Sequence, residues 1–331
     1  MPVITTTFGR NFPQAASQTI LDAAAQSGVA LPYSCKTGRC SACKCKVLKG
    51  ESHAKSDELG LTDAEKADGW VLSCVRTATT ELTIEVEDLT GVNLPKVQTQ
   101  PARIASLERL ASDVLRVKFR LPPTSNFSYL PGQYIDVIGP GGVRRSYSVA
   151  NAPAVDKQLE LHVRAVKGGV MSGYWFEAAK INDLVRLNGP LGSFFLRPLQ
   201  GLHLVFLATG TGIAPVKSML EHLATSADDD QPLSITVYWG GREAPDLYCD
   251  PANLHPKLRY VPVLSRAEQN WGGACGYVQD AMLNDAPDLG RTVVYACGSD
   301  AMIHSAQAKL TKAGLPAQHF YSDAFVCSAS S

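Results

Sequence analysis

The sequence lacks several features that would assign it to a class at once. It has no run of about 18 apolar residues, so we expect no membrane-spanning helix. It has no excess of either charge, since 31 Lys and Arg balance 31 Asp and Glu. This balance argues against nucleic acid as a main partner, because phosphate binding needs surplus cations. The first residues lack a basic segment followed by an apolar one, so we expect no signal peptide and a cytoplasmic protein.

The length and the apolar content indicate a folded, multidomain chain. At about 150 residues per domain, 331 residues predict two or three domains. Hydrophobic residues make up 45% of the chain, which excludes wholesale disorder.

The nine cysteines are unevenly distributed, and five of them precede residue 75. An odd number of cysteines in a cytosolic chain argues against a disulfide framework and favours a local metal site. Four of them, Cys35, Cys40, Cys43 and Cys74, have the C-x4-C-x2-C…C spacing of a plant-type [2Fe–2S] cluster. Two irons need four thiolates, and a single loop can supply three of them.

The residues between these cysteines fit such a loop. Ser34, Gly38, Ser41 and Ala42 are small, so backbone N–H groups can approach the sulfurs and tune the cluster. A zinc site is the alternative, although zinc loops usually pair their cysteines as two C-x2–4-C knuckles. Cys45 alternates with charged neighbours, and we interpret it as a packing residue rather than a ligand.

Hydrophobic patterns divide the chain into three regions. Strands are predicted at 3–8 and 81–87, a helix at 18–27, and a strand-like run around Cys74. Residues 91–101 have no periodicity and predict a linker. Six short strands follow, which predict a closed barrel: 103–109, 114–121, 133–138, 144–149, 159–166 and 184–188.

The last region alternates strands with helices. An apolar run at 204–208 precedes the glycine-rich turn 210–215 (GTGIAP) and a helix, which is the order of a dinucleotide-binding unit. Pro215 replaces the third glycine of the usual motif, and a proline is tolerated in the first turn of a helix. Further strands are predicted at 233–239, 258–264 and 292–297.

Several motifs resemble known families. Residues 1–90 resemble β-grasp ferredoxins. The R-x-Y-S of residues 145–148, GTGIAP and the C-G-x-x-x-M of residues 297–302 resemble the ferredoxin–NADP reductase superfamily. The order of the regions is similar to the NADH-dependent reductase components of bacterial oxygenases, of the phenol hydroxylase reductase type. It resembles still more closely the CDP-6-deoxy-3,4-glucoseen reductases, through GQYIDV, RRSYSVANAP and ELHVR among other segments.

The resemblance implies three domains and a linker. A β-grasp [2Fe–2S] ferredoxin domain is expected at 1–92 and the linker at 93–101. An antiparallel β-barrel that binds FAD is expected at 102–199, and an α/β domain with a parallel sheet that binds NAD(P)H at 200–331.

The resemblance also implies roles for individual residues. Ser148, Cys297 and Phe325 would lie at the reacting rings. The flavin would be held by Arg145, Ser146, Tyr147, Ser148, His162, Val163, Arg164, Gly169, Val170, Met171 and Ser172. The nicotinamide nucleotide would be held by Gly210, Thr211, Gly212, Pro215, Ser265, Arg266, Cys297 and Gly298.

The implied activity is electron transfer from NADH through FAD and the [2Fe–2S] cluster to an acceptor protein, an oxygenase or a dehydrase component. NADPH is the alternative donor, because Ser265 and Arg266 follow the strand 258–264 and could bind a 2′-phosphate. Two other functions stay open. One is a self-sufficient reductase of small molecules such as quinones, and the other is a non-catalytic electron carrier, against which the intact motifs argue.

Overall fold

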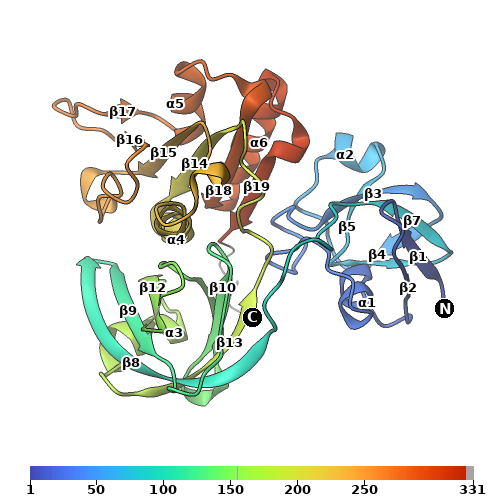
Figure 1. Cartoon of the computed structure of the whole chain (residues 1–331), viewed down its shortest axis with the longest axis horizontal. Coiled ribbons are helices and arrows are strands. Elements are labelled where there is room, and N and C mark those ends of the chain that lie inside the picture. The colour runs from blue at the N-terminus through green and yellow to red at the C-terminus, as the bar shows by residue number, and fades with distance from the viewer. Residues whose placement is uncertain (155, 326–331) are drawn as a thin grey trace. The chain divides into compact units, whose positions relative to one another are not determined.

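The structure is a computed structural model and describes residues 1–154 and 156–325. Contacts divide the chain into two compact units, which we call unit 1 and unit 2 (Figure 1). Unit 1 comprises Met1–Asn93 with two short later segments, Gly192–Phe194 and residues 322–325. Unit 2 comprises Leu94–Leu191 and Phe195–Tyr321, residue 155 excepted.

Unit 1 is built on a five-stranded sheet of order β2-β1-β7-β3-β5. The first strand lies inside this sheet, because it pairs antiparallel with β2 and parallel with β7. A separate pair is formed by β4 and β6. The strands are β1 Val3–Thr6, β2 Asn11–Pro13, β3 Lys44–Lys49, β4 Ser52–Ala54, β5 Trp70–Leu72, β6 Arg76–Ala78 and β7 Leu82–Glu85.

The predicted helix of unit 1 is confirmed as α1, Ile20–Gln26. It begins after Thr19, whose side chain accepts a hydrogen bond from the Asp22 N–H and so satisfies one of the free donors of the first turn. Its buried residues, Ile20, Leu21, Ala23 and Ala24, join the core of the unit. A short second helix, α2 Asp63–Ala67, begins with a capping box between Thr62 and Glu65.

The six strands predicted for the middle region are all present in unit 2, in the order β11-β10-β13-β8-β9-β12. A bridge between Val149 and Leu161 connects the two outer strands and closes the barrel. β8 begins at Gln98, inside the span predicted as a linker, because residues 98–101 pair with β13. The strands are β8 Gln98–Ala111, β9 Val114–Arg120, β10 Tyr134–Ile138, β11 Arg144–Ser148, β12 Gln158–Arg164 and β13 Leu184–Leu191.

The second half of unit 2 is a six-stranded sheet of order β17-β16-β15-β14-β18-β19, in which β14 is parallel to both of its neighbours. The strands are β14 His203–Thr209, β15 Ser234–Gly241, β16 Leu258–Leu264, β17 Ala274–Cys275, β18 Thr292–Gly298 and β19 Phe320–Ala324. The helices are α4 Ile213–Leu223, α5 Val278–Asn284 and α6 Asp300–Ala313. β14, β15, β16 and β18 confirm the predicted strands, and α4 begins two residues before Pro215, as its place in a first turn requires.

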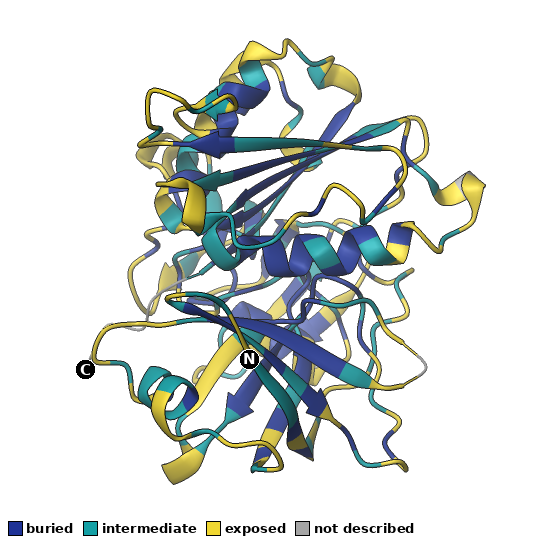
Figure 2. Ribbon diagram, turned by 90° about the vertical axis from the view of Figure 1, so that its left-hand side faces the viewer, coloured by how far each residue is buried: buried dark blue, intermediate teal, exposed yellow. Residues whose placement is uncertain are grey.

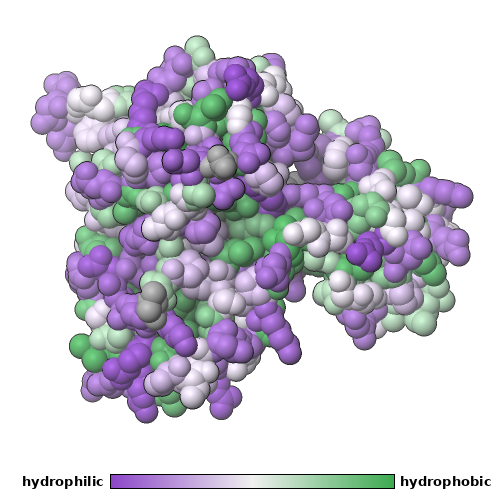
Figure 3. Space-filling model, viewed as in Figure 1, coloured by the Kyte–Doolittle hydropathy of each residue, from purple (hydrophilic) through white to green (hydrophobic). Residues whose placement is uncertain are grey.

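Buried residues concentrate on the central strands, and exposed residues on the loops (Figure 2). The space-filling view shows mostly hydrophilic groups with smaller hydrophobic areas between them (Figure 3). Among the residues described, no helix is long and apolar enough to cross a membrane.

One local expectation is corrected. The strand predicted around Cys74 ends at Leu72, and Cys74 lies in the turn between β5 and β6. After Gly169 the chain forms a single helical turn, α3 Val170–Gly173, followed by a π-helical turn at Tyr174–Ala178.

Candidate functional site

The four cysteines predicted as cluster ligands form two pairs in unit 1. The Cys35 and Cys40 side chains are hydrogen-bonded to each other, and so are those of Cys43 and Cys74. Backbone donors also reach the sulfurs: the Cys35 N–H lies 3.3 Å from Cys40 Sγ, and the Thr37 N–H lies 3.4 Å from Cys35 Sγ. The loop therefore provides both thiols and the N–H···S contacts by which proteins tune iron–sulfur clusters.

Within each pair, one thiol is more acidic than usual. The hydrogen bond from Cys40 lowers the pKa of Cys35 to about 5, against the opposing effect of burial. The hydrogen bond from Cys43 likewise lowers the pKa of Cys74, and the Gly38 N–H lowers it further. The partners Cys40 and Cys43 have raised pKa values. Because the thiolate is the form that binds metal, a bound cluster would require all four of these thiols to be deprotonated.

Two glycines allow the cysteine loop to close on the loop that follows β4. Gly38 has φ +77°, and a Cβ there would lie 2.4 Å from the Asp57 carbonyl oxygen. A Cβ on Gly60 would lie 2.8 Å from the Arg39 carbonyl oxygen. The Gly60 N–H donates to the Gly38 carbonyl at 2.8 Å, and the Ser41 hydroxyl donates to the Gly60 carbonyl. Backbone thus meets backbone where a side chain would separate the loops.

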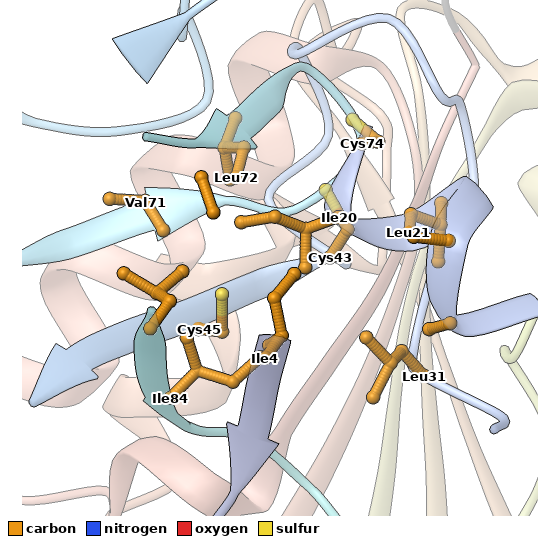
Figure 4. Close-up of a cluster of buried hydrophobic side chains, with 14 of the residues drawn as sticks. Ile4, Ile20, Leu21, Leu31, Cys43, Cys45, Val71, Leu72, Cys74 and Ile84 are labelled. Carbon is orange, nitrogen blue, oxygen red and sulfur yellow. The ribbon is translucent and has the colours of Figure 1, made fainter. Parts of the chain in front are cut away.

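Cys45 is placed differently from the four ligand candidates. It is fully buried and lies beside Ile4 and Ile84 in the core of unit 1, whereas Cys43 and Cys74 lie near each other at the edge of this core (Figure 4). Burial raises the pKa of its thiol to about 12. Its expected role in packing is therefore confirmed.

In the described part of the chain, no three His, Cys, Asp or Glu side chains converge as they would on a single metal ion. Two pairs of thiols suit a binuclear cluster, in which each iron takes two thiolates. Cys327, the last cysteine of the sequence, lies outside the described residues.

The strand predicted to bind flavin is β11, which ends at Ser148. Arg145 is exposed, and its guanidinium donates to the Arg144 carbonyl at 2.7 Å. The Ser146 hydroxyl donates to Asp136 Oδ1 at 2.6 Å. The Tyr147 hydroxyl accepts from Trp175 Nε1 at 3.0 Å, which fixes the orientation of the ring. An exposed guanidinium beside a held aromatic ring fits the diphosphate and the ring system of FAD.

The three residues of β12 that are predicted to hold the flavin, His162, Val163 and Arg164, lie in different surroundings. The His162 ring is buried, with Nδ1 3.0 Å from the Tyr248 hydroxyl and Nε2 3.0 Å from Glu160 Oε1. The Val163 side chain is fully buried in the barrel core. Arg164 lies against the glycine-rich turn, since a Cβ on Gly210 would lie 3.0 Å from its Nη1, and its Nε is 3.2 Å from Asp113. Of these three side chains, Arg164 is the one that reaches the turn.

The residues at 169–172 that are predicted to hold the flavin lie at the start of α3. Gly169 precedes α3, and the Ser172 hydroxyl accepts a hydrogen bond from the Val166 N–H at 2.8 Å. Met171 is buried in the barrel core, and Val170 is exposed. The role of these residues in binding a cofactor stays a prediction.

Five of the eight predicted nucleotide residues, Gly210, Thr211, Gly212, Cys297 and Gly298, lie where the order of the parallel strands reverses. From β14 the chain continues to β15 and β16 on one side of the sheet, and β18 lies on the other side. The turn Gly210–Gly212 follows β14, and Cys297 and Gly298 end β18 beside it. Crevices at such reversals, at the carboxyl ends of parallel strands, are where dinucleotides bind.

Two glycines in this crevice have no room for a side chain. A Cβ on Gly212 would lie 2.1 Å from the Cys297 carbonyl oxygen. Gly298 has φ +143°, and a Cβ there would lie 2.1 Å from Thr209 Oγ1. Cys297 itself is fully buried. The turn therefore packs directly on the end of β18, which brings the predicted nucleotide residues together.

The remaining predicted residues lie at two places. Ser265 and Arg266 are exposed after β16, next to the loop after β15, where the Arg266 N–H donates to the Arg242 carbonyl at 2.9 Å. Phe325 is partly buried and follows β19 in the segment assigned to unit 1. Its predicted place over the flavin stays a prediction.

Sequence reasoning did not single out the interacting charges of unit 2. Lys217 forms ion pairs with both Glu160 and Glu221, and Tyr248 contacts His162. In the sequence each is an ordinary polar residue inside a recognised motif or loop, and only the tertiary packing brings them together. A Lys and a Glu four residues apart in the helix were the one available signal.

Comparison with known families finds three matching domain families along the chain. Residues 5–79 match the family described as "2Fe-2S iron-sulfur cluster binding domain". Residues 101–196 match "Oxidoreductase FAD-binding domain", and residues 206–308 match "Oxidoreductase NAD-binding domain". The three cofactors expected from the sequence, a [2Fe–2S] cluster, FAD and a nicotinamide nucleotide, therefore each have a domain.

Similar proteins cover nearly the whole chain. A CDP-6-deoxy-L-threo-D-glycero-4-hexulose-3-dehydrase reductase of Yersinia pestis is 42% identical over 319 residues, 95% of both chains. The reductase component of the naphthalene 1,2-dioxygenase system of Pseudomonas putida is 32% identical over 330 residues, 96% of both chains. Among solved structures, the cytochrome P450 reductase GcoB of Amycolatopsis is 31% identical with a TM-score of 0.74, over 98% of this chain and 99% of that one.

These relatives align with this chain over nearly its whole length, across all three matched domains, and they are named as reductases. The protein therefore belongs to the iron–sulfur flavoprotein reductases, NAD(P)H oxidoreductases that pass electrons through FAD and a [2Fe–2S] cluster to a partner.

Proposed function

We propose that the protein is the NADH-dependent reductase of a CDP-6-deoxyhexulose 3-dehydrase. The observation that carries this choice is the 42% identity to the Yersinia pestis dehydrase reductase, against 30–33% for reductase components of aromatic oxygenases. An oxygenase is the second candidate partner, supported by those matches along more than 90% of the chain. Among the described residues no disulfide joins the cysteines, which agrees with a role in the reducing cytoplasm.

The residues described above have distinct tasks in this function. Cys35, Cys40, Cys43 and Cys74 would hold the cluster, and Arg145 with the ring of Tyr147 would hold FAD. The turn at Gly210–Gly212 and the end of β18 would place the nicotinamide, with Cys297 and Ser148 near the reacting rings. When bound, FAD accepts a hydride from the nicotinamide and releases electrons singly, which the cluster can carry.

The chain itself supplies binding and orientation. Trp175 holds the Tyr147 hydroxyl, so the ring has one preferred position before flavin binds. Thr209 accepts a hydrogen bond from the Ser299 N–H at 3.2 Å, which ties the end of β14 to the first turn of α6. These contacts reduce the ordering that binding would otherwise require.

The choice of partner can be tested by reconstitution. The purified holoprotein is mixed with NADH and either the dehydrase that the Yersinia relative serves or the ferredoxin and oxygenase of the naphthalene system. We expect NADH-dependent product formation with the dehydrase and at most slow turnover with the oxygenase. The Cys74→Ser variant is the control, because it is expected to support neither.

Two outcomes would change the proposal. Faster turnover with the oxygenase would assign the second candidate partner. Reduction of neither partner, together with quinone reduction that does not depend on Cys74, would identify a self-sufficient flavin-site reductase.

A further inference from the structure

Three side chains of α4 hold three consecutive residues that follow the flavin strand β11. Lys217 Nζ donates to the Ala150 carbonyl at 3.2 Å, and the Ser218 hydroxyl donates to the Asn151 carbonyl at 2.6 Å. Glu221 Oε2 accepts from the Ala152 N–H at 2.9 Å. We call these three contacts the α4 clip. They occupy one side of the helix and connect the flavin barrel to the nucleotide half of unit 2.

The clip is charged and partly buried, with the Glu221 side chain 29% exposed. Lys217 Nζ also lies 2.6 Å from Glu221 Oε1 and 3.3 Å from Glu160 Oε1 in β12. The side chain of Lys217 is 17% exposed and that of Glu160 is 8% exposed. A buried charge that loses its partner is costly, whereas a paired one is restricted to the geometry that satisfies it. The ion pairs therefore select one position of α4 against the barrel.

A second connection runs from the same carboxylate toward the nucleotide turn. Glu160 Oε1 lies 3.0 Å from His162 Nε2, and the other nitrogen of this ring contacts the Tyr248 hydroxyl. The Tyr248 ring meets the edge of Trp239 at 5.2 Å between centroids, and Trp239 Nε1 donates to the Gly210 carbonyl at 3.0 Å. Both connections end near Gly210–Gly212, since α4 begins at Ile213.

The segments that the clip joins are those that hold the two reacting rings. Residue 150 is two positions beyond Ser148, and Lys217 is five positions beyond Gly212. Hydride transfer requires reacting atoms about 3–3.5 Å apart, and a displacement of about 1 Å can cost two orders of magnitude in rate. A contact that sets the position of these segments therefore acts directly on the hydride step.

We propose that Lys217 and Glu221 are positioning residues for hydride transfer, which fix the flavin strand against the nucleotide turn through the α4 clip. The inference concerns the reduction of the flavin alone and holds for any electron acceptor.

The first test is the anaerobic reduction of the bound flavin by NADH in the full-length holoprotein. Lys217→Met and Glu221→Met keep the side-chain size but remove the charges. We expect the reduction rate at saturating NADH to fall about tenfold, with FAD content unchanged and the half-saturating NADH concentration within about twofold. Lys217→Arg and Glu221→Gln retain a donor and an acceptor, and we expect both to recover most of the rate.

A second test needs neither bound cofactor nor turnover. In protein stripped of FAD, Glu221→Met removes the acceptor of the Ala152 N–H, so hydrogen exchange at Ala152 is expected to accelerate several-fold. Lys309→Met is the matched control, because Lys309 forms an ion pair with Asp280 outside the clip, at 2.6 Å. This control is expected to change neither the exchange at Ala152 nor the rate of flavin reduction.

Two results would overturn the proposal. One is faster exchange at Ala152 with a rate of flavin reduction within twofold of wild type, since the clip would then be open without consequence. The other is a lower melting temperature and loss of FAD while the remaining holoprotein is reduced at the normal rate, since the clip would then serve folding alone. If the charge variants do not fold, Ser218→Ala decides: it removes one hydrogen bond, and an unchanged rate contradicts the proposal.

Discussion

Unit 1 takes the ligands of its site from one loop and one turn, whereas unit 2 assembles its site from the ends of β11, β12, β14 and β18. The first site is made of side-chain sulfurs. The second depends largely on close backbone packing, of Gly212 against Cys297 and of Gly298 against Thr209. It also depends on the ion pair between Lys217 and Glu160. Spacing in the sequence therefore specifies the first site, and tertiary packing specifies the second. The predictions below test this difference.

The largest effect is expected in unit 1, from Cys74→Ser. Loss of one of four thiolates is expected to remove the cluster, so cytochrome c reduction falls by about a hundredfold, while ferricyanide reduction from the flavin persists. Iron and sulfide, near two of each per wild-type chain, are measured beside both activities. Cys45→Ala is the control, since this core thiol is not a ligand candidate. Equal loss of both activities in a folded variant would contradict electron transfer from flavin to cluster.

In unit 2, the comparable change is an added methyl group at Gly212. Gly212→Ala would place a Cβ 2.1 Å from the Cys297 carbonyl oxygen, so the turn must move away from β18. We expect flavin reduction by NADH to slow on the order of tenfold to a hundredfold with FAD retained. Gly290→Ala is the control, because its nearest contact would be an ordinary 3.5 Å. A rate equal to wild type would mean that the turn does not place the nicotinamide.

A smaller effect is expected on the pH dependence of stability. Burial lowers the pKa of His162 below its usual 6.5, although Glu160 raises it, and Lys217 and Arg116 lower it further. The unfolded chain therefore takes up this proton first, and unit 2 loses stability as the pH falls below about 6.5. Glu160 is buried, which raises its pKa, but the hydrogen bond from His162 and the charge of Lys217 outweigh this and lower the pKa to about 2. Its contribution is lost only as the pH falls from about 4.5 toward 2.

His162 and Glu160 therefore affect stability in two separate pH ranges. Between pH 7 and pH 5, the melting temperature of unit 2 is expected to fall by a few degrees in the wild type and by less in His162→Asn. Thermal unfolding followed by FAD release measures it, with exposed His222→Asn as the control. An identical pH profile in His162→Asn and wild type would exclude His162 as the cause.

The smallest effect is expected at the exposed loops after β15 and β16. We expect NADH to be preferred, so that Arg266→Ala changes kcat/KM for NADH by no more than about twofold, because its exposed guanidinium contributes little without a 2′-phosphate. kcat/KM is measured for both nucleotides. A wild-type preference for NADPH of about tenfold, equal to about 1.4 kcal/mol, that Arg266→Ala abolishes would assign Arg266 to the 2′-phosphate.

The sequence predicts features that depend on local signals better than features that depend on tertiary packing. The cysteine spacing singled out the four thiols that lie together in unit 1, and alternation identified all six barrel strands, because both signals are local. The start of β8 inside the predicted linker was missed, because residues 98–101 become a strand only by pairing with β13, about 90 residues later. Cys74 was placed on a strand because its neighbours are apolar, although the chain turns there.

The ion pairs of Lys217 show most clearly what the sequence does not predict. Lys217 and Glu221 have the spacing of a solvent-exposed helix pair, which usually contributes a few tenths of a kcal/mol. Nothing in the local sequence indicates that β12 brings Glu160 to the same place. β19 was also not predicted, since its partner β18 is fully buried and supplies the pairing that its own sequence does not suggest.

The parallel pairing of β1 with β7 has a consequence for biosynthesis. Of the strands of unit 1, β1 comes earliest in the chain and lies between β2 and β7, so its second edge has no partner until residues 82–85 have left the exit tunnel. At 5–20 residues per second, this interval lasts on the order of ten seconds. Three of the four ligand thiols emerge well before that point, and Cys74 follows only shortly before β7. Insertion of the cluster is therefore a late event, and the nascent chain depends for several seconds on a reducing environment to keep those thiols available.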